Sequence, residues 1–387
     1  MNATRLSPRT EAMIVGGGPA GAALAIQLAR QGRAVELIEQ SAAAHHKVCG
    51  EFLSREAVAY LEGLGVDLTG LGAERVHGVR LAARKMIAAC ELPFPALSLS
   101  RRVLDEALLA LAPRAGATVL RGRRVERLQR GESGWSALVA GGETRCAPTV
   151  FLATGKHDLA GHRRPAGKQN DLVAFKIYFR LAPAQQSALR GWVELFLFPG
   201  GYAGLQLAEG GQANLCLLVK RSALQPGGNA WPALLDRMCS FSAPLAMRLD
   251  GAQPLWPKPL AIASLPYGML LADAEPGLWR LGDQAAVIPS FSGDGLSIAL
   301  HSAHLAAQVY AHGGASAEFA RRLHTQLRAS VRLATALSRL MIAAPALAQA
   351  LREWPGMMGH LASRTRVPRH ALPAEAIRIH QAGAASW

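Results

Sequence analysis

Apolar and polar positions in the first forty residues predict a strand, a helix and a second strand. Residues 12–15 are all apolar and run straight into three glycines, which is typical of a short buried strand that ends in a turn. Residues 19–31 carry apolar positions at helical spacing, and residues 34–39 again have the pattern of a buried strand. Strand, helix and strand in this order predict a βαβ unit with two parallel strands and a right-handed crossover.

The rest of the chain divides into a mixed region, a strand-rich region and a helical region. Strands are predicted near 117–120, 123–130 and 143–152, and then at 172–181, 193–198 and 213–219. Turn-rich segments separate the later strands, at 199–204 and 208–212. Helical patterns occur at 101–112, 316–340 and 345–353, and a proline-rich passage at 254–266 precedes a glycine-rich, helix-forming stretch at 278–312. This order predicts a doubly wound sheet from the first and third parts of the chain, covered by an antiparallel sheet from the middle.

Composition and charge narrow the class of protein. The 387 residues are half apolar, so a folded globular protein with a large core is expected. The net charge of +15 is strongly basic, and most of the excess is arginine scattered along the chain. Because no basic tail and no basic stretch interleaved with aromatic residues occurs, we expect no nucleic-acid binding and interpret the charge as a solvated basic face. A peripheral contact with an anionic membrane surface stays open.

The cysteines and the N-terminal segment indicate the cellular compartment in which the protein is expected. Five cysteines, without a C-x-x-C pair, favour neither a disulfide framework nor a zinc site and fit a reducing environment. The first twelve residues lack the apolar core of a signal peptide, and no run of eighteen apolar residues occurs. We therefore expect a cytoplasmic protein.

The glycines after the first predicted strand form a G-x-G-x-x-G motif at a position where it binds a dinucleotide. Gly16 and Gly18 would allow a tight turn and a close approach of the backbone to a pyrophosphate, and Gly21 would let the helix pack against the strand. Pro19 suits the first helical turn, where Ala20 follows it and the free N–H groups and the positive end of the helix dipole face the phosphates. Glu39 ends the second strand, 23 residues after Gly16, and could accept hydrogen bonds from ribose hydroxyls.

A second group of residues distinguishes FAD from NAD. Residues 279–283 have the pattern of a strand that ends in Gly-Asp, and they are followed by Pro289 and by Gly-Asp-Gly-Leu at 293–296 before a helix. This segment resembles the second FAD-binding motif of the p-hydroxybenzoate hydroxylase superfamily, which includes the geranylgeranyl reductases. The resemblance implies that Asp283 binds the ribityl chain. It also implies that Gly293, Gly295 and Leu296 present a helix N-terminus to the flavin, where a helix dipole stabilises the negative charge of the reduced ring.

A third motif and two departures refine the resemblance, which covers roughly residues 12–310. Residues 101–105 match the R-x-x-L-D start of a family helix, which implies that Arg101 reaches the cofactor; a solvated arginine in a first helical turn is the alternative. Residues 153–155 are Ala-Thr-Gly, as in the reductases, where the hydroxylases carry Ala-Asp-Gly. The electron donor implied by the superfamily is NAD(P)H. In the hydroxylases the Ala-Asp-Gly stretch serves both FAD and NAD(P)H, so the Ala-Thr-Gly found here argues against the hydroxylases' route for NAD(P)H. The W-x-W-x-I-P motif of flavin halogenases does not occur.

The segment between the βαβ unit and the helix at 101–112 carries the candidate catalytic residues. Its Cys-Gly pair at 49–50 resembles the cysteine-containing loop of geranylgeranyl reductases, so Cys49 could position substrate or relay a proton, or it could simply pack against the ring. Glu51 is either a general acid or base or, as we favour, a cap or ion-pair partner. Lys47 could lower the thiol pKa or point to water. His45 and His46 are expected to be exposed loop residues, not metal ligands.

The predicted fold is an α/β fold, a Rossmann-like FAD-binding domain interleaved with an antiparallel β-sheet substrate domain and followed by C-terminal helices. The expected bounds are 1–80, 97–170 and 265–345 for the FAD-binding domain, 81–96 and 171–264 for the substrate domain, and 346–387 for a helical tail. Residues 194–199 keep only the final Phe-Pro of the Y-x-W-x-F-P motif that flanks a lipid chain in prenyl reductases. An apolar wall remains, which suits a hydrophobic or aromatic small molecule.

Three functions stay open on the sequence. We slightly favour a monooxygenase that uses reduced flavin and oxygen to hydroxylate a hydrophobic or aromatic biosynthetic substrate. A geranylgeranyl-reductase-like enzyme that reduces a carbon–carbon double bond is the second, favoured by the Cys-Gly loop and the Ala-Thr-Gly segment. A non-catalytic FAD-binding protein is the third. The substrate and the oligomeric state are not indicated.

Overall fold

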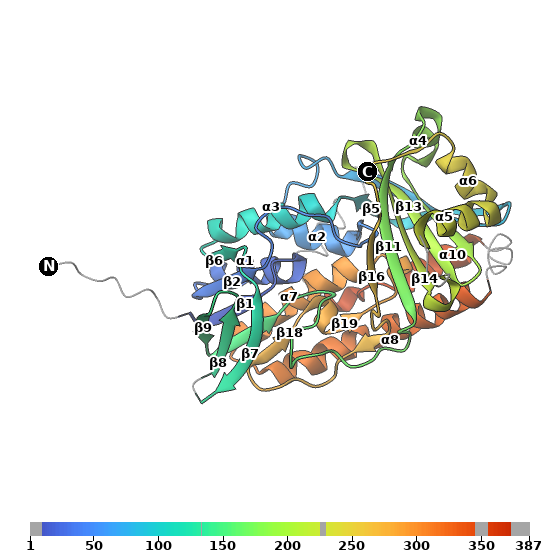
Figure 1. Ribbon diagram of the computed structural model, residues 1–387. Helices are drawn as coiled ribbons and strands as arrows, with labels where there is room; N and C mark the ends of the chain where they lie inside the picture. Colours follow the sequence, from blue (N-terminus) through green and yellow to red (C-terminus); the bar gives the residue numbers. More distant parts are fainter. Residues whose placement is uncertain (1–9, 133, 225–229, 345–354, 373–387) are drawn as a thin grey trace.

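The computed structural model describes residues 10–132, 134–224, 230–344 and 355–372. A parallel sheet with its helices forms one half of the molecule and a large, mostly antiparallel sheet forms the other. The long helix α8 (Ser316–Ala343) runs beneath both (Figure 1). Within the described residues, no helix is both long and apolar enough to cross a membrane.

The first half contains a five-stranded parallel sheet in the order β18-β10-β1-β2-β6. Its strands are β1 (Ala12–Val15), β2 (Val35–Glu39), β6 (Thr118–Arg121), β10 (Thr149–Leu152) and β18 (Leu278–Arg280). Alternate residues of each strand point to opposite faces, so Ile14 and Leu37 pack against helices while Met13, Val15 and Ile38 pack against the small sheet of β7 (Val125–Gly131), β8 (Gly134–Val139) and β9 (Glu143–Ala147). Both faces are thereby buried, as a parallel sheet requires.

Four helices share one core on the side of the parallel sheet opposite the small sheet. They are α1 (Pro19–Arg30), α2 (Arg55–Gly63), α3 (Arg101–Arg114) and α7 (Gly295–Ala311). The turn between β1 and α1 needs its glycines for two reasons. Gly16 has φ +106°, and a Cβ on Gly21 would lie 1.9 Å from the Gly16 carbonyl oxygen. Strand and helix can therefore approach this closely only without side chains.

The second half contains a nine-stranded sheet with the main order β15-β11-β14-β13-β12-β4-β5-β3, in which β16 pairs with β11. Its strands are β3 (Phe52–Ser54), β4 (Glu74–Ala83), β5 (Met86–Ser98), β11 (Leu172–Arg180), β12 (Trp192–Phe198), β13 (Gly201–Ala208), β14 (Gln212–Lys220), β15 (Gln253–Pro254) and β16 (Leu260–Ala263). One face carries Phe175, Ile177 and Phe196 into a core under α5 (Ala230–Phe241) and α6 (Ala243–Leu249). The other face turns toward the parallel sheet.

The remaining elements are shorter. They are α4 (Pro183–Leu189), α10 (Pro355–Arg364), β17 (Met269–Leu270), β19 (Ala286–Val287), and the 3-10 turns η1 (Glu209–Gly211), η2 (Arg221–Ala223), η3 (Gly282–Gln284), η4 (Ser290–Ser292) and η5 (Arg369–Ala371). Met341 and Ile342 of α8 and Met358 of α10 pack with Leu81 and Leu197 of the large sheet. The C-terminal helices thus close the space that the sheet leaves open.

The predicted fold class is confirmed, with a Rossmann-like parallel sheet, an antiparallel sheet and C-terminal helices. Several strands differ from the prediction. The 199–204 segment, predicted as turn-rich, leads into β13, and the prediction did not include β3, β4, β5, β8, β15, β16, β17 or β19. The predicted domain boundary after residue 80 falls inside β4. The helix predicted at 345–353 lies outside the described residues.

Candidate functional site

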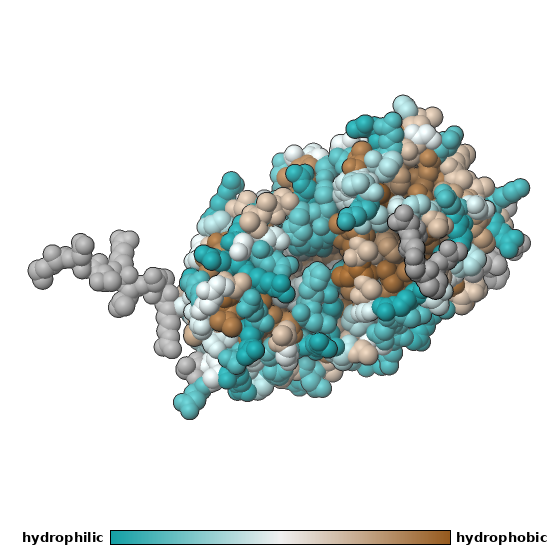
Figure 2. All heavy atoms as spheres, viewed as in Figure 1, coloured by the Kyte–Doolittle hydropathy of each residue, from teal (hydrophilic) through white to brown (hydrophobic). Residues whose placement is uncertain are grey.

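A cavity of about 1210 Å³ runs between the two halves and collects most of the predicted site residues. Figure 2 shows a hollow in the middle of the visible face, with hydrophobic residues gathered along its right side. Ligand pockets usually measure about 300–1,000 Å³, so this cavity has room for a dinucleotide and a second molecule. One arm lies along the β1–α1 turn, and the other lies between the large sheet and the C-terminal helices.

The cofactor arm is lined by the β1–α1 turn and by the end of β2. Gly16, Gly18, Pro19 and Ala20 line it at the N-terminus of α1, where the first N–H groups of the helix have no partner within the helix. A Cβ on Gly16 would lie 2.5 Å from the Ala153 carbonyl oxygen, so the turn has no room for a side chain. This bare helix N-terminus has the chemistry that a pyrophosphate requires.

Glu39 closes the far end of the cofactor arm. Its side chain is buried, and it accepts hydrogen bonds from the backbone N–H of Gly17 at 2.6 Å and of Ser41 at 2.8 Å. These bonds hold both carboxylate oxygens at the cavity wall, and each oxygen keeps a lone pair for a further donor. Glu39 is therefore placed where the ribose hydroxyls of a dinucleotide would need an acceptor.

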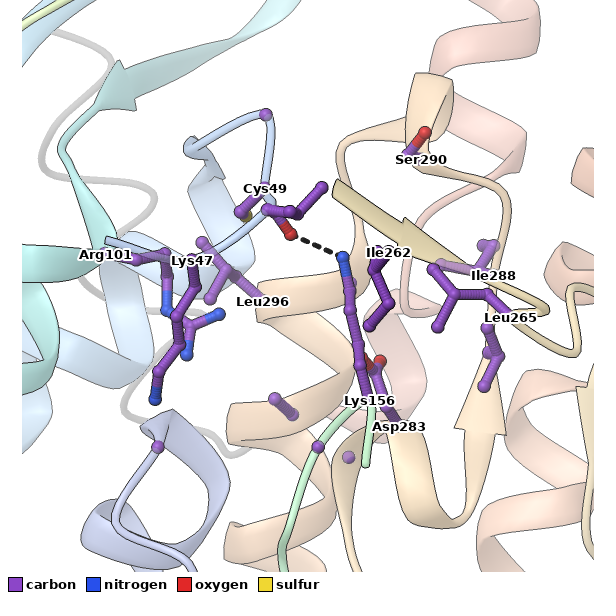
Figure 3. A pocket seen from close by; sticks show the side chains of 18 of the residues that line it. Lys47, Cys49, Arg101, Lys156, Ile262, Leu265, Asp283, Ile288, Ser290 and Leu296 are labelled. Carbon is purple, nitrogen blue, oxygen red and sulfur yellow. Dashed lines mark hydrogen bonds between the residues drawn. The ribbon is translucent and has the colours of Figure 1, made fainter. Parts of the chain in front are cut away.

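Residues of the second FAD-binding motif line the cofactor arm together with the β1–α1 turn. Asp283, Gly293, Gly295 and Leu296 line the cavity, at the end of β18 and at the N-terminus of α7. An added Cβ on Gly295 would meet no atom within 4 Å, so a bare helix end faces open space there. Figure 3 shows Asp283 and Leu296 on opposite sides of this part of the cavity. The two motifs, which are far apart in sequence, thus line one cavity whose residues fit FAD.

Arg101 lines the cavity but is bound to its own helix. Its guanidinium makes two hydrogen bonds to Asp105, at 2.7 Å and 2.9 Å, and Lys47 forms an ion pair with the same carboxylate at 3.0 Å. Burial opposes ionisation of Asp105, yet Arg101 and Lys47 outweigh it and hold the pKa of Asp105 below its ordinary value. Lys47 therefore neither points freely to water nor contacts the thiol.

Two predicted cofactor residues do not line the cavity. Gly21 packs against Gly16 behind the turn, which is the packing role that the motif implies. Pro289 lies before η4, and its carbonyl accepts a hydrogen bond from the Ser292 hydroxyl at 2.8 Å. Both residues shape the wall from behind it.

The Cys49 loop, residues 47–51, lines the cavity where the two arms meet. Side chains from distant elements fix its position. Lys156 crosses from the end of β10 and donates to the Val48 carbonyl at 2.5 Å (Figure 3). The Asn214 amide of β14 donates to the carbonyls of Cys49 at 3.1 Å and of Gly50 at 3.0 Å. The Cys49 thiol lines the cavity and accepts a hydrogen bond from the Glu51 N–H at 3.3 Å. The thiol is therefore fixed at the wall and reachable from the cavity.

Glu51 is fully buried within an ion pair. Its carboxylate is bonded to the Lys176 ammonium and to the Tyr178 hydroxyl of β11, and it accepts the N–H of Arg101 at 2.8 Å. Burial raises the pKa of Glu51, and Lys176 opposes that effect. Its backbone lies in the left-handed region, with φ 65°, which is uncommon for a residue other than glycine. The structure thus places Glu51 in the ion-pair arrangement that we favoured, and a catalytic role stays a prediction.

His46 differs from its prediction and His45 agrees with it. His45 is exposed. His46 is half-buried between Tyr178 and Trp256, with ring centroids 5.3 Å and 4.8 Å apart. Burial lowers the pKa of His46 to about 4, helped by the Lys176 charge. The expectation of an exposed His46 is therefore wrong, because Trp256 from a distant segment covers it.

Within the described ranges no group of His, Cys, Asp or Glu could hold a metal ion.

The substrate arm is apolar over most of its length. Its wall on the large sheet includes Val79, Leu81, Val193 and Leu195, and its opposite wall is formed by Leu337 and Met341 of α8 and by Met357, Met358 and Leu361 of α10. Ile262, Leu265 and Ile288 line the part near Lys156 (Figure 3). Tyr202 stands between the two arms, with its hydroxyl 3.1 Å from the Ser290 hydroxyl. An apolar passage of this kind would accept a long hydrocarbon chain.

A buried ion pair joins the C-terminal segment to the α7 N-terminus. Arg366 lies 3.5 Å from Asp294, and its guanidinium stacks over the rings of Phe52 and Phe94. Asp294 is fully buried, and burial raises its pKa to about 7. The segment after α10 is thereby tied to the turn that carries Gly293 and Gly295.

Sequence reasoning missed the residues that hold the Cys49 loop and line the substrate arm. Lys176, Tyr178, Asn214 and Arg366 come from segments that carry no motif, and Lys156 follows the Ala-Thr-Gly segment directly but was not singled out. The one available indication was Lys176, a charged residue within an otherwise apolar predicted strand. Its partner, 125 residues earlier, could not be identified from the pattern.

Comparison with known proteins agrees with this geometry. A family model described as "FAD binding domain" matches residues 9–150. The menaquinone reductase of Mycolicibacterium smegmatis is 27% identical over 326 residues, which cover 80% of this chain and 78% of that protein.

Two solved structures share the fold. The flavin-dependent brominase Bmp2 has a TM-score of 0.76 at 16% identity and covers 97% of this chain and 99% of its own. A PqsL variant from P. aeruginosa has a TM-score of 0.73 at 18% identity and covers 89% of this chain and 99% of its own. At such low identity these structures establish the architecture and no more.

Proposed function

We propose that this chain, which belongs to the FAD-dependent oxidoreductases of the p-hydroxybenzoate hydroxylase superfamily, reduces a carbon–carbon double bond of a prenylated lipid. The observation that carries the proposal is the substrate arm, an apolar passage that begins at the Cys49 loop and continues between the large sheet and the helices α8 and α10. A polyprenyl chain is long, apolar and rich in double bonds, so it matches the passage in shape and in chemistry. This proposal adopts the second of the functions that the sequence left open.

The relatives support a reductase acting on a lipid quinone. Menaquinone carries a prenyl tail on a two-ring head group, and the chain resembles menaquinone reductases over four fifths of its length. The Cys-Gly pair and the Ala-Thr-Gly segment were also the features that favoured reduction over hydroxylation. Hydroxylation, which we had slightly favoured, becomes the alternative that the experiment below tests.

The residues of the cofactor arm would hold FAD along its whole length. Gly16, Gly18 and the N-terminus of α1 would bind the pyrophosphate, and Glu39 would accept the ribose hydroxyls. Asp283 would bind the ribityl chain, and the N-terminus of α7 would face the flavin ring. Bound there, FAD supplies the pair of electrons that the reduction needs. We further propose NAD(P)H as the source of these electrons.

Cys49 is the candidate proton donor. Reduction of a double bond adds a proton to one of its carbons, and the donor must reach the cavity without admitting bulk water. The Cys49 thiol lines the cavity, and the loop that carries it is fixed by Asn214, Lys156 and buried Glu51. Buried Glu51 would then act through the loop, as a positioning residue.

The substrate class implies contact with a membrane surface, since prenylated lipids reside in bilayers. The chain carries a net charge of +15, which suits a peripheral contact with an anionic surface from the cytoplasmic side. Binding to vesicles of anionic lipid that weakens with salt would support this part of the proposal.

The function is tested by reoxidation without oxygen. FAD-loaded protein is reduced anaerobically and mixed with a prenylated quinone, either without oxygen or in air-saturated buffer. The proposal predicts that the oxidised flavin spectrum returns on mixing with the lipid in the absence of oxygen, and that the lipid extracted from this mixture is still heavier by two hydrogen atoms after air has reoxidised its ring. Reoxidation by oxygen alone, with an oxygen atom gained by the lipid, would favour hydroxylation. Stable FAD without any substrate response would favour a non-catalytic protein.

A further inference from the structure

The cavity face of β13 is interrupted at one position. Alternate residues of a strand share a face, so Tyr202, Gly204 and Gln206 face the cavity and line it. The residues between them, Ala203 and Leu205, belong to the core on the other side. Gly204 thus leaves a gap between two large side chains in the wall of the substrate arm.

Neither backbone conformation nor packing requires a glycine at position 204. Its φ is not positive, so other residues could adopt its conformation. A Cβ on Gly204 would meet Leu195 Cδ2 at 3.5 Å and the Cys216 carbonyl oxygen at 3.8 Å, which are ordinary contact distances. Gly201 of the same strand differs, because a Cβ there would lie 2.3 Å from the Leu218 carbonyl oxygen. A glycine within a strand weakens it and often marks a close approach of a ligand.

The surroundings of Gly204 form a shallow notch. Leu195 of β12 and Cys216 of β14 pair with Gly204 on either side, and both line the cavity. Burial raises the pKa of the Cys216 thiol to about 12, so this thiol is uncharged at neutral pH. Tyr202 and Gln206 close the notch along the strand. Its floor is a bare peptide, on which a flat ring can lie at van der Waals distance.

We propose that Gly204 determines substrate specificity by receiving a planar ring of the substrate in this notch. The inference rests on the proposed function, since it concerns the molecule that enters the substrate arm. An acyclic prenyl chain is narrower and does not need the space above Gly204. The residue would therefore distinguish ring-bearing lipids from open-chain ones.

The test compares Gly204→Ala and Gly204→Val with the wild type and with Gly63→Ala. Gly63 is exposed on α2, and a Cβ there would meet no atom within 4 Å, which makes it a matched control. The ligands are a short-tailed menaquinone and geranylgeraniol, which has no ring. Their dissociation constants are measured with oxidised, FAD-loaded protein, from the change in flavin absorbance on binding and without turnover.

The inference predicts that Gly204→Val weakens menaquinone binding about tenfold or more and changes geranylgeraniol binding by less than about twofold. Gly204→Ala should have a smaller effect in the same direction. FAD content should match the wild type and the melting temperature should not fall, because the added Cβ meets its neighbours at ordinary contact distances. Equal weakening of both ligands, or of neither, would overturn the assignment of a ring to the notch. A wild type that binds neither ligand would instead overturn the proposed function.

Discussion

The two arms of the cavity are built from different parts of the polypeptide. The cofactor arm is lined largely by glycines and helix N-termini, at the turn between β1 and α1 and at the N-terminus of α7, with the side chains of Glu39 and Asp283 beside them. The substrate arm is lined by side chains from several strands and two helices, and among them Gly204 is one of few bare positions. On the proposed function, the first arm would recognise its ligand mainly through fixed backbone groups, and the second would select its ligand mainly by volume.

Because of this difference, the two arms should tolerate substitutions to different extents. Backbone N–H groups at a helix end are positioned by the helix itself, so a change there disturbs the fold and the ligand together. Side chains on one face of a sheet can change size without moving the strands, provided that the cavity takes up the added volume. We expect the cofactor arm to be intolerant and the substrate arm to be adjustable.

The largest effect is expected for Gly21→Ala in the cofactor arm. The added Cβ would lie 1.9 Å from the Gly16 carbonyl oxygen, so α1 must move away from β1. We expect a loss of about 3 kcal/mol in the free energy of unfolding and loss of most bound FAD. Urea denaturation and the flavin content of purified protein measure both. If Gly21→Ala retained FAD as well as Gly204→Ala does, the contrast between the arms would be wrong.

The second-largest effect is expected for the buried ion pair of Glu51 and Lys176, which lies between the two arms. Glu51→Gln would leave the Lys176 ammonium buried without its partner, and we expect it to lower the free energy of unfolding by about 3 kcal/mol. Adding Lys176→Met should restore much of the loss, because the remaining charge is then removed. The pair of Glu318 and Arg322, which lies at the surface with its arginine exposed, is the control, where Glu318→Gln should cost less than about 0.5 kcal/mol. A double variant no more stable than Glu51→Gln would contradict this account.

A smaller effect is expected from Asp294, where the C-terminal segment meets the cofactor arm. Burial raises the pKa of Asp294 to about 7, so the folded protein binds this proton more tightly than the unfolded chain does. Its contribution to stability is therefore complete at low pH and is lost as the pH rises toward 7. Between pH 5 and pH 7 we expect the wild type to lose about 2 kcal/mol relative to Asp294→Asn. Asp171→Asn, at an exposed position, removes the same charge and should track the wild type.

The smallest effect is expected at Cys49. Cys49→Ser keeps a hydroxyl at the cavity wall but makes it a weaker acid than the thiol, so we expect kcat to fall about tenfold with little change in KM. Cys146→Ser, at an exposed cysteine, is the control. Full turnover by Cys49→Ser would remove Cys49 from the mechanism and leave the loop a purely structural role.

The cofactor arm could be predicted because its determinants are local. Gly16 to Gly21 specify a strand, a turn and a helix within a few residues, and Asp283 to Leu296 do so a second time. The substrate arm could not be predicted in the same way, since its wall takes alternate residues from β4, β12, β13 and β14. Their register depends on pairing between strands far apart in the chain, which no local pattern contains.

Individual residues were predicted wrongly or incompletely for the same reason, because their surroundings come from distant parts of the chain. β13 begins with a glycine and has another at position 204, so its composition is that of a turn although its neighbours hold it as a strand. His46 becomes buried only when Trp256, 210 residues later, folds over it. Glu51 could be proposed as an ion-pair partner, but the identity of Lys176 depended on the fold.

The mass of the product after anaerobic turnover tests the central claim most directly. FAD-loaded protein is reduced, mixed with a prenylated quinone without oxygen, and the extracted lipid is exposed to air before mass spectrometry. Air returns a reduced ring to the quinone but leaves a saturated carbon–carbon bond unchanged. We predict a quinone that stays heavier by two hydrogen atoms. Recovery of the original mass, or a lipid that has gained an oxygen atom only when oxygen was present, would contradict the account.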